Sequence, residues 1–250
     1  MAEKKIKTIK KADGSTTTAT VAQAKPVGNA TPFRIGAVIA WIAAIAFEVV
    51  ALLVVVGKLE ITFMNSLAFM IIALVLDLAC VITGSLLWKK ANHIDPASEA
   101  NKVKFWLWNN MGLIVCAFAF IPFVIVALTN KNADKKTKTI ATVVAVIALL
   151  IGSLFSIEWN PISAEEKEAA MEQLGETSVY WSNFGHVYHT TPDCSHLNQS
   201  DELTEGNVEQ AIAAGRTRMC KTCEARGDVV IEDKGEDTAE VTDEVTEAAA

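Results

Sequence analysis

Four long apolar runs constrain the fold of this chain more than any other feature. They cover residues 33–56, 61–88, 105–128 and 139–157, and each contains 19 residues or more. A helix rises about 1.5 Å per residue, so about 20 apolar residues cross the roughly 30 Å of hydrocarbon in a bilayer. Because backbone polar groups find no water in lipid, each run must be a helix. The sequence predicts an all-α membrane domain of four transmembrane helices over residues 33–157.

The polar segments around these runs divide the rest of the chain. Residues 1–32 are rich in lysine and threonine and are expected to be a disordered basic tail. Residues 158–178 form a predicted linker, in which Ser163 and Glu166 have the spacing of a capping box that begins a short amphipathic helix. Residues 179–226 are predicted to be a small α+β module, and the acidic residues 227–250 a second disordered tail.

Lysines and arginines indicate how the four helices are oriented. With four spans, the N-terminus, the second connecting segment and the C-terminal region lie on one side. The first two of these carry eleven lysines and arginines, against five on the opposite side. Because positive residues concentrate on the cytoplasmic side, we expect a multi-pass protein of the cell membrane with both termini in the cytoplasm. That compartment would also keep the cysteines reduced.

The charge of the C-terminal region restricts its partners. From Glu158 onward the chain has 21 acidic and 6 basic residues. A nucleic-acid partner requires clustered lysines and arginines to neutralise phosphates, so this composition argues against one. The expected partners are the lipid bilayer and a protein bound through the module, and the oligomeric state is left open.

Cysteines and histidines concentrate between residues 179 and 226. Cys220 and Cys223 form a Cys-x-x-Cys pair, a spacing at which one turn can direct two thiolates at the same ion. Cys194 is the only cysteine available for the other half of a site, and His189 precedes it in a His-x4-Cys arrangement. We predict that these four residues bind Zn²⁺. The competing fourth ligands are His186 and His196.

The residues around this cluster predict a hairpin followed by a helix. Val179–Trp181 and Val187–Tyr188 are expected to be short strands joined by a turn that contains Asn183 and Gly185. Helical spacing from about Gly206 to Ala214 places Val208, Ala211 and Ile212 on one face, and Gly215 is a helix stop. So small a domain has few apolar side chains for a core, and a metal would supply the missing stability.

This order of residues resembles a known module. Tyr188-His189, Cys194-x-x-Leu197, a helix rich in alanine, Gly215 and Cys220-x-x-Cys223 are similar to the small zinc module of the Ada repair protein. They are more similar to its shortened relatives at the ends of bacterial secreted and membrane proteins. The resemblance covers about a fifth of the chain and implies a zinc-ribbon-like fold.

The chain also departs from that module at several positions. His189 stands where the repair protein has its first cysteine, the first spacing is one residue longer, and Met219 stands where the relatives commonly have proline. In the repair protein one zinc-bound cysteine accepts a methyl group from DNA phosphate. The changed first half of the site and the acidic surroundings give no ground for extending that activity to this chain.

Two carboxylates lie inside the apolar runs, where burial of charge is costly and usually has a reason. These are Glu48 and Asp77. Measured from a tight hairpin at residues 57–60, they differ in depth by about 10 Å, too far for a shared proton. One interpretation is an ion or proton path. The other is a pair of protonated carboxyls that hydrogen-bond to Asn65, Asn109 or Asn110.

The leading functional hypothesis is non-enzymatic: a membrane-anchored binding or regulatory module whose zinc stabilises the fold. Four protein ligands leave no open position for a catalytic water, and no glutamate stands in a His-Glu-x-x-His or His-x-Glu arrangement. Two alternatives stay open. One is a small transporter or channel that uses Glu48 and Asp77, with the module as gate or sensor. The other is a thiol redox or metal-dependent enzyme, in which two cysteines could pair as a disulfide.

Overall fold

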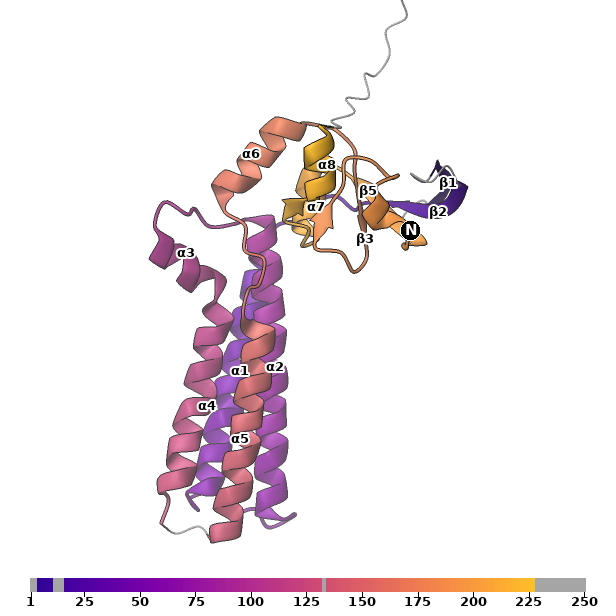
Figure 1. Cartoon of the computed structure of the whole chain (residues 1–250). Helices are drawn as coiled ribbons and strands as arrows, with labels where there is room; N and C mark the ends of the chain where they lie inside the picture. The colour runs from indigo at the N-terminus through magenta and orange to yellow at the C-terminus, as the bar shows by residue number, and fades with distance from the viewer. Residues whose placement is uncertain (1–3, 11–15, 132–133, 228–250) are drawn as a thin grey trace, which may run out of the picture.

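The computed structural model describes residues 4–10, 16–131 and 134–227. A bundle of four long helices carries a small mixed module at one end (Figure 1). The predicted acidic tail, residues 227–250, lies outside the described residues except for Gly227.

The four long helices correspond to the four apolar runs, with shifted ends. They are α1 (Thr31–Val55), α2 (Ser66–Ile94), α4 (Met111–Thr129) and α5 (Lys135–Ser156), each long and apolar enough to cross a membrane. A short helix, α3 (Lys102–Asn109), occupies the start of the third run, and α4 begins after Asn110. The first connection is longer than the expected hairpin at residues 57–60. Helix α2 starts only at Ser66, because Asn65 accepts hydrogen bonds from the N–H groups of Leu67 (3.0 Å) and Ala68 (3.2 Å) and caps it.

Small residues form much of the bundle core. Alanines from α1, α2, α4 and α5 pack around the buried rings of Phe120 and Phe123, which allows the backbones to approach closely. At Gly84 of α2, an added Cβ would lie 2.4 Å from the Nε1 atom of Trp41 on α1. Many other large apolar side chains point outward, as shown by Phe118 at 74% and Ile42 at 62% exposure. The outer surface of the bundle is therefore apolar.

The linker and the module follow α5. The linker contains α6 (Ala164–Leu174), and the module contains β3 (Val179–Ser182), β4 (Val187–Tyr188), the 3₁₀ turn η1 (Ser195–Leu197), β5 (Glu202–Gly206), α7 (Val208–Ala213), β6 (Arg218–Met219) and α8 (Lys221–Arg226). Strand β5 pairs antiparallel with β3, and β4 pairs parallel with β6. Both predicted strands are thus present, and an antiparallel bridge between Tyr180 and His189 joins them as in the predicted hairpin. Each strand also pairs with a further strand, so that two small sheets form.

The N-terminal segment differs from the predicted disordered tail. Strands β1 (Lys4–Lys10) and β2 (Thr16–Gln23) pair antiparallel, and β2 pairs parallel with β5, so the larger sheet has the order β1-β2-β5-β3. Ala19 and Val21 are each 2% exposed and pack with Leu203. The sequence prediction failed because β2 is a short threonine- and alanine-rich strand that finds its apolar partners about 180 residues further along the chain.

Local signals in the linker and the module are confirmed. Ser163 and Glu166 form the capping box of α6, and Gly175 ends that helix with φ 55°. Val208, Ala211 and Ile212 are buried on one face of α7, and Gly215 follows with φ 85°.

Polar contacts hold the module against the bundle. Lys167 of α6 donates to the Ile94 carbonyl at the end of α2 (2.8 Å) and to Glu209 of α7 (3.1 Å). His93 of α2 lies 3.7 Å from Glu158, an ion-pair distance that is longer than a hydrogen bond. The module therefore rests directly on the end of α2.

Candidate metal centre

One His/Cys/Cys/Cys cluster lies inside the module. Its members are His189, Cys194, Cys220 and Cys223, and one donor atom from each lies within 4.8 Å of all the others. The Sγ atoms of Cys194 and Cys220 are 4.0 Å apart, and the Nδ1 atom of His189 is 3.7 Å from the Sγ atom of Cys223. All four residues are buried. They are positioned to bind a metal ion.

These separations agree with tetrahedral coordination by zinc. Zn–S bonds of about 2.3 Å and Zn–N bonds of about 2.0–2.1 Å at tetrahedral angles place the ligand atoms about 3.6–3.8 Å apart. A disulfide would require sulfurs about 2.05 Å apart, and all three cysteines of the cluster are free thiols. The measured separations of 3.7 and 4.0 Å are thus close to those of ligands that share one ion.

Short secondary elements bring the two halves of the cluster together. His189 follows β4, and its backbone exchanges two hydrogen bonds of 2.8 Å with Tyr180 of β3. The Cys220 N–H donates to the Tyr188 carbonyl (2.8 Å), which extends the β4–β6 pairing to the first cysteine of the pair. Cys223 lies in the first turn of α8 and Cys194 directly before η1.

The surroundings of the ligands favour metal binding. Burial, together with the charge of nearby His196, lowers the pKa of His189 to about 4, so its imidazole is neutral and free to coordinate. Burial works to raise the pKa of Cys220, but hydrogen bonds from the backbone N–H groups of Cys223 and Thr222 outweigh it and lower that pKa. Burial raises the pKa of Cys194 to about 12, a desolvation that a bound cation would offset.

The two competing histidines lie outside the cluster. His196 is exposed, and its Nε2 atom lies 3.0 Å from the Thr222 hydroxyl. His186 is exposed in the loop before β4 and lines a separate groove. The structure thus brings together the four residues that spacing predicted as ligands. The ring nitrogens of His186 and His196 do not belong to the cluster.

Glu48 and Asp77 lie closer together than the sequence predicted. Glu48 is seven residues from the end of α1 and Asp77 eleven from the start of α2, because α2 begins at Ser66. The two side chains interact across these antiparallel helices and are 4% and 0% exposed. None of their four carboxyl oxygens has a hydrogen-bond partner within the described part of the chain.

The prediction that asparagines hydrogen-bond to these carboxyls is also wrong. Asn65 caps α2, as described above. The amide of Asn109 donates to the Phe105 carbonyl (3.1 Å) and that of Asn110 to the Trp106 carbonyl (3.0 Å), both within α3. The carboxyl pair therefore stands alone in the apolar core.

The fold and the cluster define a class: four apolar helices of membrane-spanning length that carry a small module with a His-Cys₃ metal-binding cluster. Comparison of the chain with models of protein families, with characterised proteins and with solved structures gives no match. The similarity to Ada-like modules therefore rests on the residues of the cluster and their spacing.

Proposed function

We propose that the chain is an integral membrane protein whose cytoplasmic module holds one structural Zn²⁺ ion and acts, without catalysis, as a membrane-anchored binding or regulatory unit. The observation that carries the proposal is the closed set of four buried donors, His189, Cys194, Cys220 and Cys223. Four protein ligands complete a tetrahedral site and leave no position for a reactive water.

The proposed placement in a membrane is supported by the apolar outer surface of the bundle and by the charges at its ends. Arg34 at the start of α1 and Lys89 and Lys90 near the end of α2 lie at the end that carries the module, as do Lys102 and Lys104 of α3. The four lysines of β1, a strand of the larger sheet, add to this side. Lys58, Lys131 and three lysines at the start of α5, Lys135, Lys136 and Lys138, lie at the opposite end. The surplus of positive residues beside the module supports a cytoplasmic module and a reduced state of its thiols.

The metal is proposed to stabilise the module, because its core is divided and small. Cys194, Cys220 and Cys223 pack in one cluster with Leu203 and the β2 residue Val21. A second cluster lies around Ile212 and Trp181. A bound ion would join the segment before β5 to α8, so metal binding and folding are coupled.

Metal analysis of the purified full chain under reducing conditions tests this proposal. We expect one zinc per chain, and thiols of the module that resist alkylation until a chelator is added. His189→Ala should lower the metal content, whereas His186→Ala and His196→Ala are matched controls that should retain it. A folded chain without metal, or with metal retained by His189→Ala, would overturn the assignment.

A second candidate function is proton or cation transport through the bundle, with the module as gate or sensor. The observation that favours it is the buried pair Glu48 and Asp77, whose four carboxyl oxygens have no hydrogen-bond partner among the described residues. Two adjacent carboxyls in such a site hold at least one proton or a cation, since two bare charges would be too costly.

Flux measurements on the chain in lipid vesicles test this candidate. Glu48→Gln and Asp77→Asn should abolish proton- or sodium-dependent flux, while Glu60→Gln, at an exposed carboxylate between α1 and α2, should leave it unchanged. Equal flux in all variants would exclude transport through this pair.

A further inference from the structure

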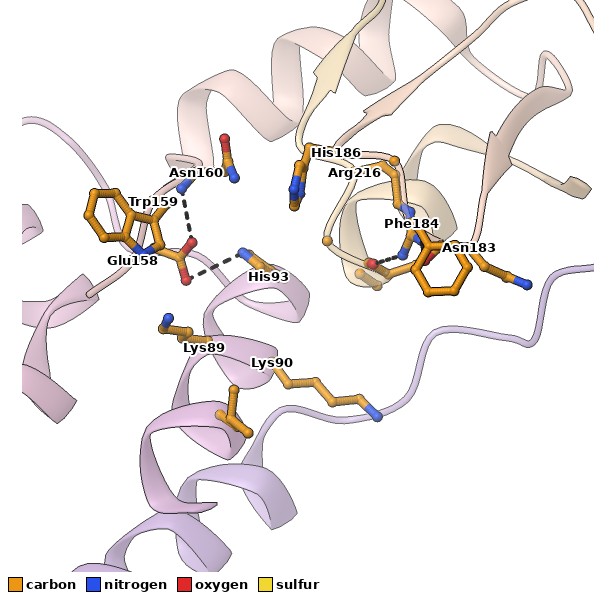
Figure 2. A pocket seen from close by; sticks show the side chains of 15 residues that line it. Lys89, Lys90, His93, Glu158, Trp159, Asn160, Asn183, Phe184, His186 and Arg216 are labelled. Carbon is orange, nitrogen blue, oxygen red and sulfur yellow. Dashed lines mark hydrogen bonds and ion pairs between the residues drawn. The ribbon is translucent and has the colours of Figure 1, made fainter. Parts of the chain in front are cut away.

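A groove of about 770 Å³ lies where the module meets the bundle. One wall comes from the end of α2 and from the segment after α5, and the other from the loop at residues 183–186 and from the end of α7 with the three residues after it (Figure 2). We name it the junction groove. It is separate from the metal ligands, none of which lines it.

The junction groove carries an excess of positive charge. Lys89, Lys90 and Arg216 line it, against one carboxylate, Glu158. That carboxylate is 6% exposed, accepts a hydrogen bond from the Asn160 N–H (3.1 Å) and lies 3.7 Å from His93. The groove therefore has a surplus of two positive charges when its histidines are neutral.

Arg216 is fixed in this wall by backbone groups alone. Its guanidinium donates to the carbonyls of Ser182 (2.7 Å) and Asn183 (2.6 Å) and also to that of Ala214. Within the described residues no carboxylate pairs with it, and its buried Nε atom has no hydrogen-bond partner. The arginine thus contributes a charge whose position is set before any ligand arrives.

The groove also offers a free imidazole. In Figure 2 the His186 side chain extends into the space between Glu158 and Arg216. His186 is exposed. Its ring can donate one hydrogen bond to an anion held by the neighbouring cations.

Large apolar side chains border this polar wall. Leu86 is 50% exposed on the outer face of α2, Trp159 is 64% exposed and Phe184 is 96% exposed. A soluble anion would need the cations but not this apolar border. A phospholipid needs both, because its phosphate lies where its acyl chains begin, and exposed indoles favour that depth.

We propose that the junction groove binds the headgroup of an anionic phospholipid, with the phosphate beside Lys89, Lys90 and His186 and the acyl chains along Leu86. The proposal rests on the membrane placement proposed above. A bound lipid would bridge the bundle and the module and would make their contact sensitive to the charge of the surrounding bilayer.

Quenching of tryptophan fluorescence by acyl-brominated lipids tests the proposal on the full chain in vesicles. Trp159→Phe identifies the part of the signal that comes from the groove. Brominated phosphatidylglycerol should quench that part more than brominated phosphatidylcholine, since the two differ only in the headgroup. Lys90→Gln with His186→Gln, two exposed positions whose replacement should leave the fold intact, is expected to reduce the preference about fivefold or more.

Lys104→Gln is the matched control: an exposed lysine at the same end of the bundle that does not line the groove. It should keep the preference of the parent chain. Equal quenching by both lipids, or equal losses in the groove and control variants, would overturn the lipid site. Loss of the preference on adding inorganic phosphate would overturn the lipid in favour of a soluble anion. No quenching by either lipid would instead contradict the membrane placement.

Discussion

The Nδ1 atom of His189 lies 3.7 Å from the Sγ atom of Cys223, although 34 positions separate the two residues. The intervening chain forms β5 and α7, and β5 also accepts the N-terminal strand β2. Closing the metal cluster therefore requires this whole segment to fold. Metal binding, the larger sheet and the contact with α2 should respond to one another.

Replacement of a cysteine ligand should remove the metal and loosen the module while the bundle stays intact. Cys194→Ser leaves three donors around a buried site, so we expect loss of bound zinc and a separate low-temperature unfolding step of the module. Cys80→Ser, at a partly buried thiol of α2, is the control. Calorimetry with metal analysis measures both, and an unchanged metal content in Cys194→Ser would contradict the ligand set.

The N-terminal strand should stabilise the module. Val21 is 2% exposed beside Leu203, so Val21→Ala should lower the free energy of unfolding of the module by about 2 kcal/mol. Lys25→Ala, at an exposed side chain just after β2, should have little effect. Proteolysis of the module at increasing denaturant compares the variants. Equal stability in both would mean that β2 contributes nothing to the core.

Close packing of α1 on α2 should depend on Gly84. Its added Cβ would lie 2.4 Å from Trp41 and 3.1 Å from the Ala37 carbonyl, whereas at Gly36 the nearest atom is the flexible Cδ1 of Leu87 at 3.2 Å. Gly84→Val should therefore destabilise the bundle by about 1–3 kcal/mol, and Gly36→Ala by much less. Thermal unfolding in detergent measures the difference. Similar melting temperatures would show that the helices can separate at little cost.

The contact between Glu158 and His93 should make the stability of the junction depend on pH. Burial works to raise the pKa of Glu158, but His93, together with the Asn160 N–H and the charge of Lys89, outweighs it and holds that pKa below the usual 4.5. A lowered carboxyl pKa contributes stability that is complete above pH 4.5 and is lost as the pH falls through the folded-state pKa.

Glu158→Gln should thus cost about 1 kcal/mol at neutral pH. The difference from the parent chain should shrink on acidification. Glu168→Gln, at an exposed carboxylate of α6, is the control. A constant difference across the acid range would mean that charge plays no part at this contact.

The metal cluster was predictable because short spacings along the chain identify its candidate ligands. A Cys-x-x-Cys turn, one further cysteine and a histidine at short spacing leave few combinations, and burial then excluded the exposed His186 and His196. Capping residues of α6 and the buried face of α7 were predictable for the same reason, since a helix is specified by neighbours three and four positions away.

The relation between Glu48 and Asp77 was not predictable from spacing. Their depths depend on where α2 begins, and the cap at Asn65 moves that start five residues beyond the beginning of the apolar run. A shift of five residues along a helix is about 7 Å, enough to turn two separate carboxyls into a facing pair.

The sequence by itself determined the four apolar helices, the ligand set and the charge difference between the two ends of the bundle, because composition and short-range spacing specify them. Only the tertiary structure decided that β2 completes the larger sheet, that Glu48 meets Asp77, and that Arg216 and Lys90 share one groove. These relations join residues far apart in the chain, and they depend on helix register and strand pairing, which no local pattern encodes.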